Sequence, residues 1–170
     1  MELVLYYSTG DPRMKKQEMK VFTMYEGWDK DQQRRSTLVG KTMLAGMESS
    51  RLFHEKREAL IEKKYDVDEI QQRILNGDGG SWIKETYDPD AIFQLDRYHV
   101  YQEILRKIND RSAQREARNL FEEGKTEELL EFLLVYADSV ETTDEKDNRS
   151  RNARELYRYL NNNKAGLLPY

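Results

Sequence analysis

The residues of this sequence that are best placed to do chemistry gather around Asp78. Residues 74–83 read ILNGDGGSWI, which predicts a buried strand that ends in an acidic, glycine-flanked turn and opens a helix. Open α/β sheets place their chemistry at the carboxyl edge of the strands, so we expect the Asp78 carboxylate at such an edge. The glycines permit positive φ and let a metal, a phosphate or another backbone come close. Asp-Gly is also among the commonest turn dipeptides, and alone it indicates only a turn.

A second polar switch point follows in residues 93–101, which read FQLDRYHVY. The short apolar run at residues 91–95 predicts a strand, and the apolar residues that come next have helical spacing. Asp96 and His99 are therefore expected where a strand becomes a helix. Because both carboxylates follow short apolar runs, we expect Asp78 and Asp96 to end neighbouring strands on the same edge of a sheet.

Three motifs in order carry a family resemblance: YEGW at residues 25–28, LNGDGGSWI at residues 75–83 and LDRYH at residues 95–99. They resemble the DDE transposases of bacterial insertion sequences of the ISLre-two type, which are related in architecture to Mutator-like transposases. The resemblance covers essentially the whole chain. It implies an RNase H-like core interrupted by a helical insertion, in an enzyme of DNA recombination that cuts and joins strands at the ends of a mobile element. It also implies transposon-end DNA as a partner and a homo-oligomer when the protein is full length.

The resemblance assigns roles to three residues. DDE chemistry needs three carboxylates that hold two divalent metals about 3.5–4 Å apart, and Mg²⁺ or Mn²⁺ suits such oxygen ligands. Asp78 matches the second carboxylate of the family, which makes it the catalytic and metal-binding candidate. Asp96 and His99 match a C/D-x-x-H element of Mutator-like enzymes, and we expect them to position the substrate strand or the core rather than to bind the metals.

Two departures from the family pattern concern the other carboxylates. The first Asp of the family lies on the first strand, upstream of YEGW, but residues 3–8 contain no carboxylate and Asp11 lies in a predicted turn. The final Glu, in a helix after the insertion, would fall beyond Tyr170. We therefore expect the truncated middle of a transposase, with weak or no metal binding and no activity alone.

The predicted fold is α/β: a partial RNase H-like core, made of a hairpin plus a parallel crossover, followed by an all-helical insertion region. The core spans residues 1–108 and the helical region residues 109–170. Residues 3–8 and 18–25 form the hairpin around a turn at residues 9–12, and the second strand is central because both of its faces carry bulk. Ser49 or Ser50 caps a helix that ends near Lys64, and residues 67–75 lead into the strand before Asp78. By periodicity alone, the later helices are equally a small bundle that closes the sheet's exposed face.

Several local expectations complete the predicted core. Residues 26–28 leave the sheet, with Trp28 packing over its end, and residues 29–35 form a charged, solvated loop. Residues 37–45 form another extended segment. We expect Glu26 on the surface or at a helix cap, and His54 exposed or packed rather than a ligand.

Composition limits the class of protein. The chain has 170 residues, 35% of them charged, and a net charge of −4, which argues against tight DNA binding by the chain alone. The absence of cysteine excludes disulfides and cysteine-based zinc sites and fits a reducing cytosol, so we expect a cytoplasmic protein. No apolar run approaches the roughly 18 residues of a membrane span, and no signal peptide is evident.

Two other classes of protein fit the same residues. One is a non-catalytic binding or regulatory module in which Gly77-Asp78-Gly79 is only a turn and surface helices bind a protein partner. The other is a small metal-dependent phosphodiesterase that uses Asp78 with Asp96 and His99. The lack of any further clustered carboxylate or nucleophile counts against the second class.

Overall fold

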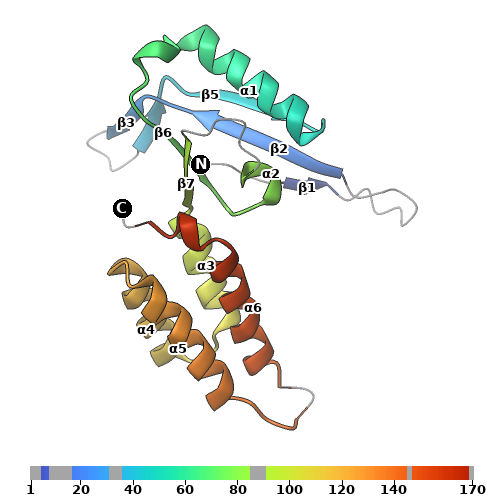
Figure 1. Cartoon of the computed structure of the whole chain (residues 1–170), viewed down its shortest axis with the longest axis vertical. Helices are drawn as coiled ribbons and strands as arrows, with labels where there is room; N and C mark the ends of the chain where they lie inside the picture. The colour runs from blue at the N-terminus through green and yellow to red at the C-terminus, as the bar shows by residue number, and fades with distance from the viewer. Residues whose placement is uncertain (1–4, 8–16, 31–35, 85–90, 145–146, 169–170) are drawn as a thin grey trace. The chain divides into compact units, whose positions relative to one another are not determined.

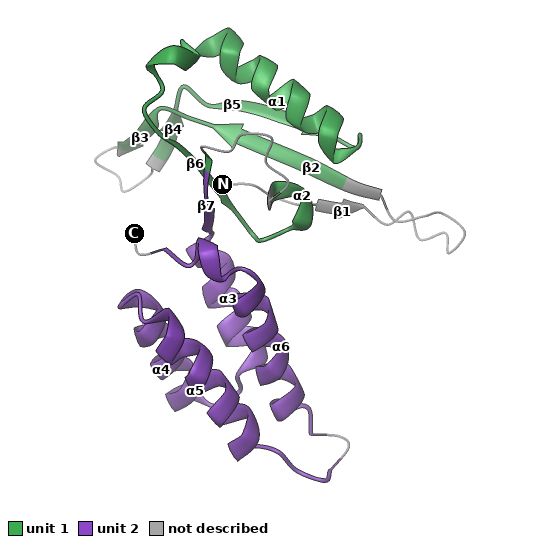
Figure 2. Ribbon diagram, in the orientation of Figure 1, with its two compact units in different colours: residues 1–91 green, residues 92–170 purple. Residues whose placement is uncertain are grey.

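The computed structural model describes residues 5–7, 17–30, 36–84, 91–144 and 147–168, and it shows a mixed α/β chain. The predicted turn at residues 9–12, with Asp11, lies outside the described residues. The chain divides into two compact units, residues 1–91 and residues 92–170 (Figure 2). The predicted functional division into residues 1–108 and 109–170 stays a prediction.

A three-stranded antiparallel sheet organises the first unit (Figure 1). Its strands are β1 (Leu5–Tyr7), β2 (Gln17–Met24) and β5 (Thr42–Gly46), and β2 lies between the other two. Leu5 pairs with Met19 and Val21 pairs with Ala45, which sets the register. The predicted strand at residues 18–25 and its central place are confirmed.

Beyond β2 the chain forms a second, two-stranded ribbon, whose first strand and pairing were not predicted from the sequence. β3 (Gly27–Lys30) pairs in antiparallel fashion with β4 (Ser36–Val39), with Trp28 opposite Leu38. Residues 26–28 leave the β1-β2-β5 sheet, as expected. The solvated loop expected from residue 29 was wrong at Asp29 and Lys30, because these residues pair with β4. Residues 31–35 and the Trp28 side chain lie outside what the structure describes. The expected extended segment at residues 37–45 is confirmed as β4 and β5, which are separated by a turn where Gly40 has φ +61°.

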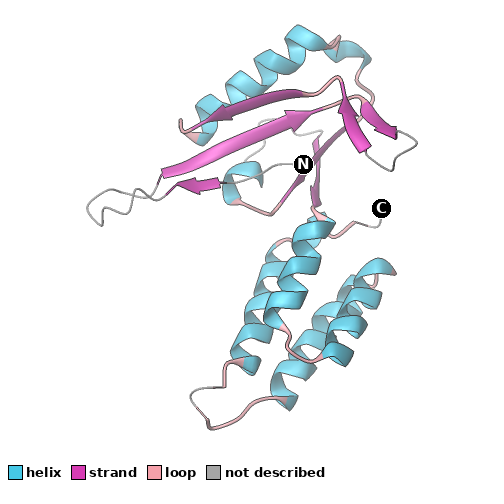
Figure 3. Ribbon diagram, turned by 180° about the vertical axis from the view of Figure 1, so that it is seen from behind, coloured by secondary structure: helices cyan, strands magenta, loops and turns pink. Residues whose placement is uncertain are grey.

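Helix α1 (Ser50–Lys64) lies along β2 and β5, as Figures 1 and 3 show from opposite sides. The Ser49 hydroxyl caps it by accepting a hydrogen bond from the Leu52 N–H (3.4 Å), which confirms the predicted start and end. Phe53, His54 and Arg57 form its buried face. A 3₁₀ turn, η1 (Val67–Glu69), then leads to β6 (Arg73–Gly77) and to the short helix α2 (Ser81–Lys84).

The predicted strand, acidic turn and helix around Asp78 are thus present. Among the described residues, however, β6 is not part of the β1-β2-β5 sheet. The parallel pairing that the crossover predicts is not confirmed, and a specific RNase H-like fold is not shown. What the structure shows is a mixed α/β arrangement of small sheets and helices.

The second unit is helical. β7 (Ala91–Leu95), whose first residue belongs to the first unit, is followed by α3 (Arg97–Lys107), α4 (Arg111–Glu122), α5 (Thr126–Ser139), α6 (Arg149–Asn162) and η2 (Lys164–Gly166). Asp110 caps α4 by accepting a hydrogen bond from the Ala113 N–H at 2.7 Å. Gly124, with φ +69°, makes the turn into α5. The predicted strand at residues 91–95 and the change to helices after it are confirmed.

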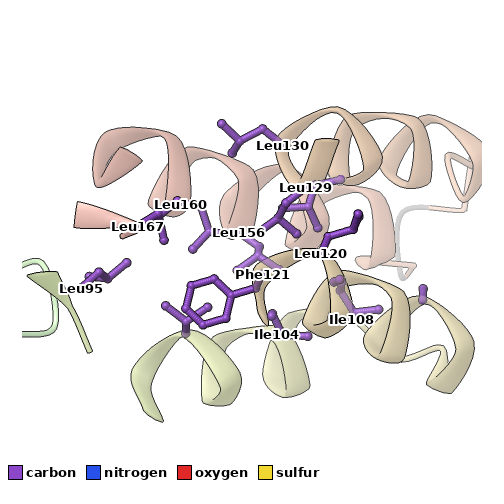
Figure 4. Close-up of a cluster of buried hydrophobic side chains, with 14 residues drawn as sticks. Leu95, Ile104, Ile108, Leu120, Phe121, Leu129, Leu130, Leu156, Leu160 and Leu167 are labelled. Carbon is purple, nitrogen blue, oxygen red and sulfur yellow. The ribbon is translucent and has the colours of Figure 1, made fainter. Parts of the chain in front are cut away.

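The core of this unit is built from the apolar stripes that helical periodicity predicts (Figure 4). Its buried members are Leu95, Val100, Ile104, Ile108, Ala113, Ala117, Leu120, Phe121, Leu129, Leu130, Leu133, Leu156, Leu160 and Leu167. At Gly166 an added Cβ would meet the Phe93 ring at 2.6 Å, so this close approach requires glycine. Within the described residues, no helix combines the length and apolar character needed to cross a bilayer.

Candidate functional site

The Asp78 carboxylate is held in a defined orientation at the end of β6. Its Oδ1 accepts a hydrogen bond from the Gly80 N–H (3.0 Å), and Gly79 between them adopts φ +89°. An aspartate that binds the backbone two residues later forms an Asx turn. The left-handed conformation at Gly79 favours glycine, which explains one of the two glycines after the carboxylate.

The second glycine keeps open a space beside two polar atoms. A Cβ at Gly80 would lie 3.3 Å from Asp78 Oδ1 and 3.4 Å from Trp82 Nε1. The carboxylate oxygen and the indole nitrogen therefore converge on the same side of the turn. Any side chain at residue 80 would crowd both of them.

Trp82 is buried against helix α1. Its ring packs edge-to-face on Phe53, with 5.4 Å between ring centroids, and the Lys20 ammonium lies 5.8 Å from the ring centroid. His54 Nε2 donates a hydrogen bond to the Trp82 carbonyl (2.6 Å), and the His54 side chain is itself buried. His54 is thus packed rather than a metal ligand, in line with the sequence expectation. It ties α1 to the helix that begins after the Asp78 turn.

Two buried polar atoms near Asp78 have no hydrogen-bond partner among the described residues. They are Asn76 Oδ1 and Trp82 Nε1. A buried polar group without a partner costs on the order of 1–3 kcal/mol, so native proteins rarely keep one without a reason. Asn76 lies in β6, two positions before the turn that begins at Asp78, and Trp82 lies in α2 directly after it. The segment around the carboxylate therefore holds a buried acceptor and a buried donor that the described residues leave without a partner.

An ion-pair network joins the beginning of β6 to α1. Glu58 accepts from Arg57 at 2.7 Å and from Arg73 at 2.8 Å. Arg57 is buried, and its guanidinium lies 6.0 Å from the centroid of the Phe22 ring. A charged cluster therefore fixes the start of β6 to α1. After the end of β6, the hydrogen bond of His54 likewise fixes α2 to α1.

Glu26, the other carboxylate considered in this unit, has a surface role. It is exposed and pairs with Lys64 at the end of α1 (3.2 Å). Its side chain also fills the space next to Gly40, where an added Cβ would meet the carboxyl carbon at 2.6 Å. It therefore contributes to the local fold, as expected of a surface residue.

Asp96 and His99 lie at the start of α3 in the second unit. Asp96 is 9% exposed, its Oδ1 accepts from the Tyr98 N–H (2.9 Å), and its Oδ2 lies 3.3 Å from His99 Nδ1. Both carboxylate oxygens thus have partners within α3. Asp96 therefore caps α3 and orients the His99 ring, and the substrate-positioning role expected for the two residues stays a prediction.

Asp78 and Asp96 belong to different units, so the prediction that they share one edge of a sheet stays a prediction. The described residues do not fit a two-metal centre, because no group of three His, Cys, Asp or Glu side chains among them could hold an ion. Asp78 can supply one ligand to such a centre. The sequence did not predict the contacts of Phe53, His54 and Lys20 with Trp82, since they span 28 positions or more along the chain.

Comparison with known proteins gives a family. The sequence pattern described as "Uncharacterised protein family (UPF0236)" matches residues 5–170. This chain belongs to the UPF0236 family. A UPF0236 protein of Caldanaerobacter subterraneus subsp. tengcongensis, whose name combines eleven gene designations, is 26% identical over 113 residues. The match covers 65% of this chain and 23% of that protein, so this UPF0236 chain spans less than a quarter of the relative. No solved structure matches it.

Proposed function

We propose that this UPF0236 chain is the middle part of a DDE transposase of the ISLre-two type. The full-length protein would cut and join DNA strands at insertion-sequence ends. The observation that carries the proposal is the turn after β6, in which the Gly80 N–H orients the Asp78 carboxylate beside the unpaired Trp82 Nε1. This is the motif in which the resemblance places the second catalytic carboxylate.

The order of elements supports the finer proposal of a partial RNase H-like core. Antiparallel strands are followed by α1, and then by a strand that ends at the carboxylate, as the resemblance predicts. The helices α4 to α6 follow where the proposal expects the helical insertion, at residues 109–170. Asp96 and His99 lie before it, at the start of α3, and are joined by a hydrogen bond.

The relative's name is a second support. Eleven gene designations of one organism share a single protein name. A protein encoded many times in one genome is what a mobile element that inserts copies of itself would produce. The short match to that longer relative also agrees with a chain that forms only part of the active protein.

Two divalent ions, Mg²⁺ or Mn²⁺, would supply the activation of the attacking hydroxyl and the stabilisation of the leaving oxygen in the full-length enzyme. In this chain, Asp78 would contribute one carboxylate ligand. The remaining ligands would come from other parts of the longer protein. The 170-residue chain alone is therefore proposed to bind Mg²⁺ weakly and to cleave no DNA.

The proposal is tested with a longer protein. It is expressed from a reading frame that joins this chain to the coding segments on either side of it in the genome. A labelled element end is incubated with this longer protein and Mn²⁺, and strand cleavage is measured. We expect Asp78→Asn to reduce cleavage to background and Asp68→Asn, the same change at an exposed site on η1, to leave it unaltered. Equal cleavage by all three proteins would refute the role of Asp78.

A second candidate function is a binding module without catalysis. It is favoured by the absence of any metal-binding group of three among the described residues. This candidate would be distinguished from a transposase fragment by three results. The chain would fold stably, it would bind a protein partner, and metal would change neither its folding nor its binding. A small independent phosphodiesterase would instead need metal-dependent cleavage by the 170-residue chain alone.

A further inference from the structure

Helix α4 carries three arginines on one face. Arg111, Arg115 and Arg118 follow one another at i, i+4 and i+7, which places them in a single stripe. The stripe lies opposite the buried face of the helix, which consists of Ala113, Ala117, Leu120 and Phe121. We call these three residues the α4 arginine face.

The α4 arginine face borders a surface hollow of about 450 Å³. The residues that line it are all polar: Arg111, Gln114, Arg115, Arg118, Asn119 and Glu122. Glu122, at one end, accepts a hydrogen bond from the Tyr101 hydroxyl (2.9 Å). The Arg118 guanidinium lies 4.9 Å from the centroid of the same Tyr101 ring, which limits how far this cation can move.

The α4 arginine face differs from most arginines of the chain in its lack of acidic partners. Within the described residues, none of its three guanidinium groups forms an ion pair. Most of the other described arginines do, namely Arg51, Arg57, Arg73, Arg106, Arg149, Arg151 and Arg154. Like charges at i and i+4 repel each other, so an unneutralised arginine stripe is a cost to the helix unless an external anion meets it.

Charge is segregated between neighbouring helices of this unit. Helix α4 carries three arginines and two glutamates, whereas α5 carries four acidic residues and no basic one. Although the net charge of the chain is −4, α4 therefore carries a locally positive face. An anionic partner would be repelled by α5 and directed to α4.

We propose that the α4 arginine face binds the phosphate backbone of DNA. The identity of the partner rests on the proposed transposase function, and the surface itself rests on the geometry above. Guanidinium groups bind phosphate oxygens in bidentate fashion, and the amides of Gln114 and Asn119 line the same hollow. The stripe extends roughly 10 Å along the helix, a distance over which duplex DNA offers several phosphates. The hollow has no apolar lining residue that could enter a lipid surface.

The test measures binding of the 170-residue chain to a fluorescent 30-base-pair duplex by anisotropy, in EDTA, from low to physiological salt. The first variant replaces Arg111, Arg115 and Arg118 with Gln. The matched control replaces Arg149, Arg151 and Arg154 with Gln, which removes the same charge from ion-paired arginines on α6. A third variant replaces the α4 arginines with Lys. Circular dichroism checks that each variant keeps its helices.

We expect the α4 Gln variant to lose most binding and to flatten the dependence of log K on log salt by roughly 2 to 3. The α6 control and the α4 Lys variant should keep most of the DNA affinity and most of its dependence on salt. The proposal is overturned if the wild-type chain does not bind, if the α6 control loses as much as the α4 variant, or if vesicles with anionic lipid compete as well as DNA. Because the assay contains no metal and leaves Asp78 intact, its outcome is independent of the cleavage test above.

Discussion

Asp78 and Asp96 are both acidic residues at the boundary of a strand and a helix, yet their surroundings differ. Asp96 uses both carboxylate oxygens within α3, on the Tyr98 N–H and on His99. Asp78 Oδ1 accepts a hydrogen bond from the Gly80 N–H and lies beside the indole nitrogen of Trp82, which has no hydrogen-bond partner among the described residues. Asp96 is thus a helix cap, whereas the role proposed for Asp78 rests on its place beside this buried nitrogen.

The two histidines of the chain allow a direct comparison at the scale of single residues. His54 is 1% exposed and donates to the Trp82 carbonyl, whereas the His99 side chain is 32% exposed. His54→Ala should destabilise the first unit by about 2–4 kcal/mol, because it leaves a cavity and an unpaired carbonyl. His99→Ala should cost less than about 1 kcal/mol.

Urea unfolding measures this difference with two probes: tryptophan fluorescence for the first unit, which holds Trp28 and Trp82, and circular dichroism for the helical second unit, which holds His99. Equal destabilisation by the two substitutions would contradict the buried, hydrogen-bonded role of His54.

At the scale of elements, the Arg57–Glu58–Arg73 network is the connection between α1 and the strand of Asp78. Glu58→Gln removes the carboxylate that neutralises a buried guanidinium, so we expect a loss of about 2–4 kcal/mol in the unfolding free energy of the first unit. Glu62→Gln, an exposed change on the same helix, is the control and should stay within about 0.5 kcal/mol. The same urea titration measures both, and an unchanged Glu58→Gln variant would contradict the proposed connection.

Helices α3 and α6 are joined by an ion pair that makes a pH-dependent contribution. The hydrogen bond from Lys107 holds the pKa of the Glu155 carboxyl below its ordinary value of 4.5. A carboxyl whose pKa is lowered by folding stabilises the folded state above its unfolded pKa. That contribution is lost as the pH falls below 4.5 and through the folded pKa.

We therefore expect Glu155→Gln to lower the thermal unfolding midpoint, followed by circular dichroism, at pH 7. The difference in midpoint between the variant and the wild type should shrink as the pH falls below 4.5. It should vanish once the Glu155 carboxyl is protonated in both the folded and the unfolded protein. A difference of the same size at pH 3 and pH 7 would show that the ion pair is not its cause.

The elements also show which features the sequence alone could predict. The helices of the second unit followed from apolar residues at helical spacing, because this signal is local, and the structure adds caps such as Asp96 and Asp110. The strand β3 and its pairing with β4 were missed because none of the described side chains of this ribbon is buried, so β3 lacks the apolar alternation by which strands are recognised. The contacts of His54 and Lys20 with Trp82 were missed because they join distant parts of the chain, for which one sequence offers no local signal.

For the whole molecule, the proposed catalytic carboxylate and the proposed DNA-binding surface lie in different compact units. The first unit holds the Asp78 turn between α1 and α2, and the second unit bears the α4 arginine face on a well-packed helical core. Because the net charge of the chain is −4, we expect DNA to bind it at the proposed α4 arginine face rather than over the whole surface. Catalysis would then depend on parts of the longer protein that complete the carboxylate set around Asp78.

The most direct test of this account is strand cleavage of a labelled element end in Mn²⁺ by the longer protein, with and without Asp78. The account predicts cleavage by the longer protein, none by its Asp78→Asn variant and none by the 170-residue chain alone. Cleavage that persists in the Asp78→Asn variant would contradict the assignment of Asp78 as a catalytic carboxylate. Cleavage by the 170-residue chain that depends on Asp78 would contradict the claim that this chain holds only part of the site.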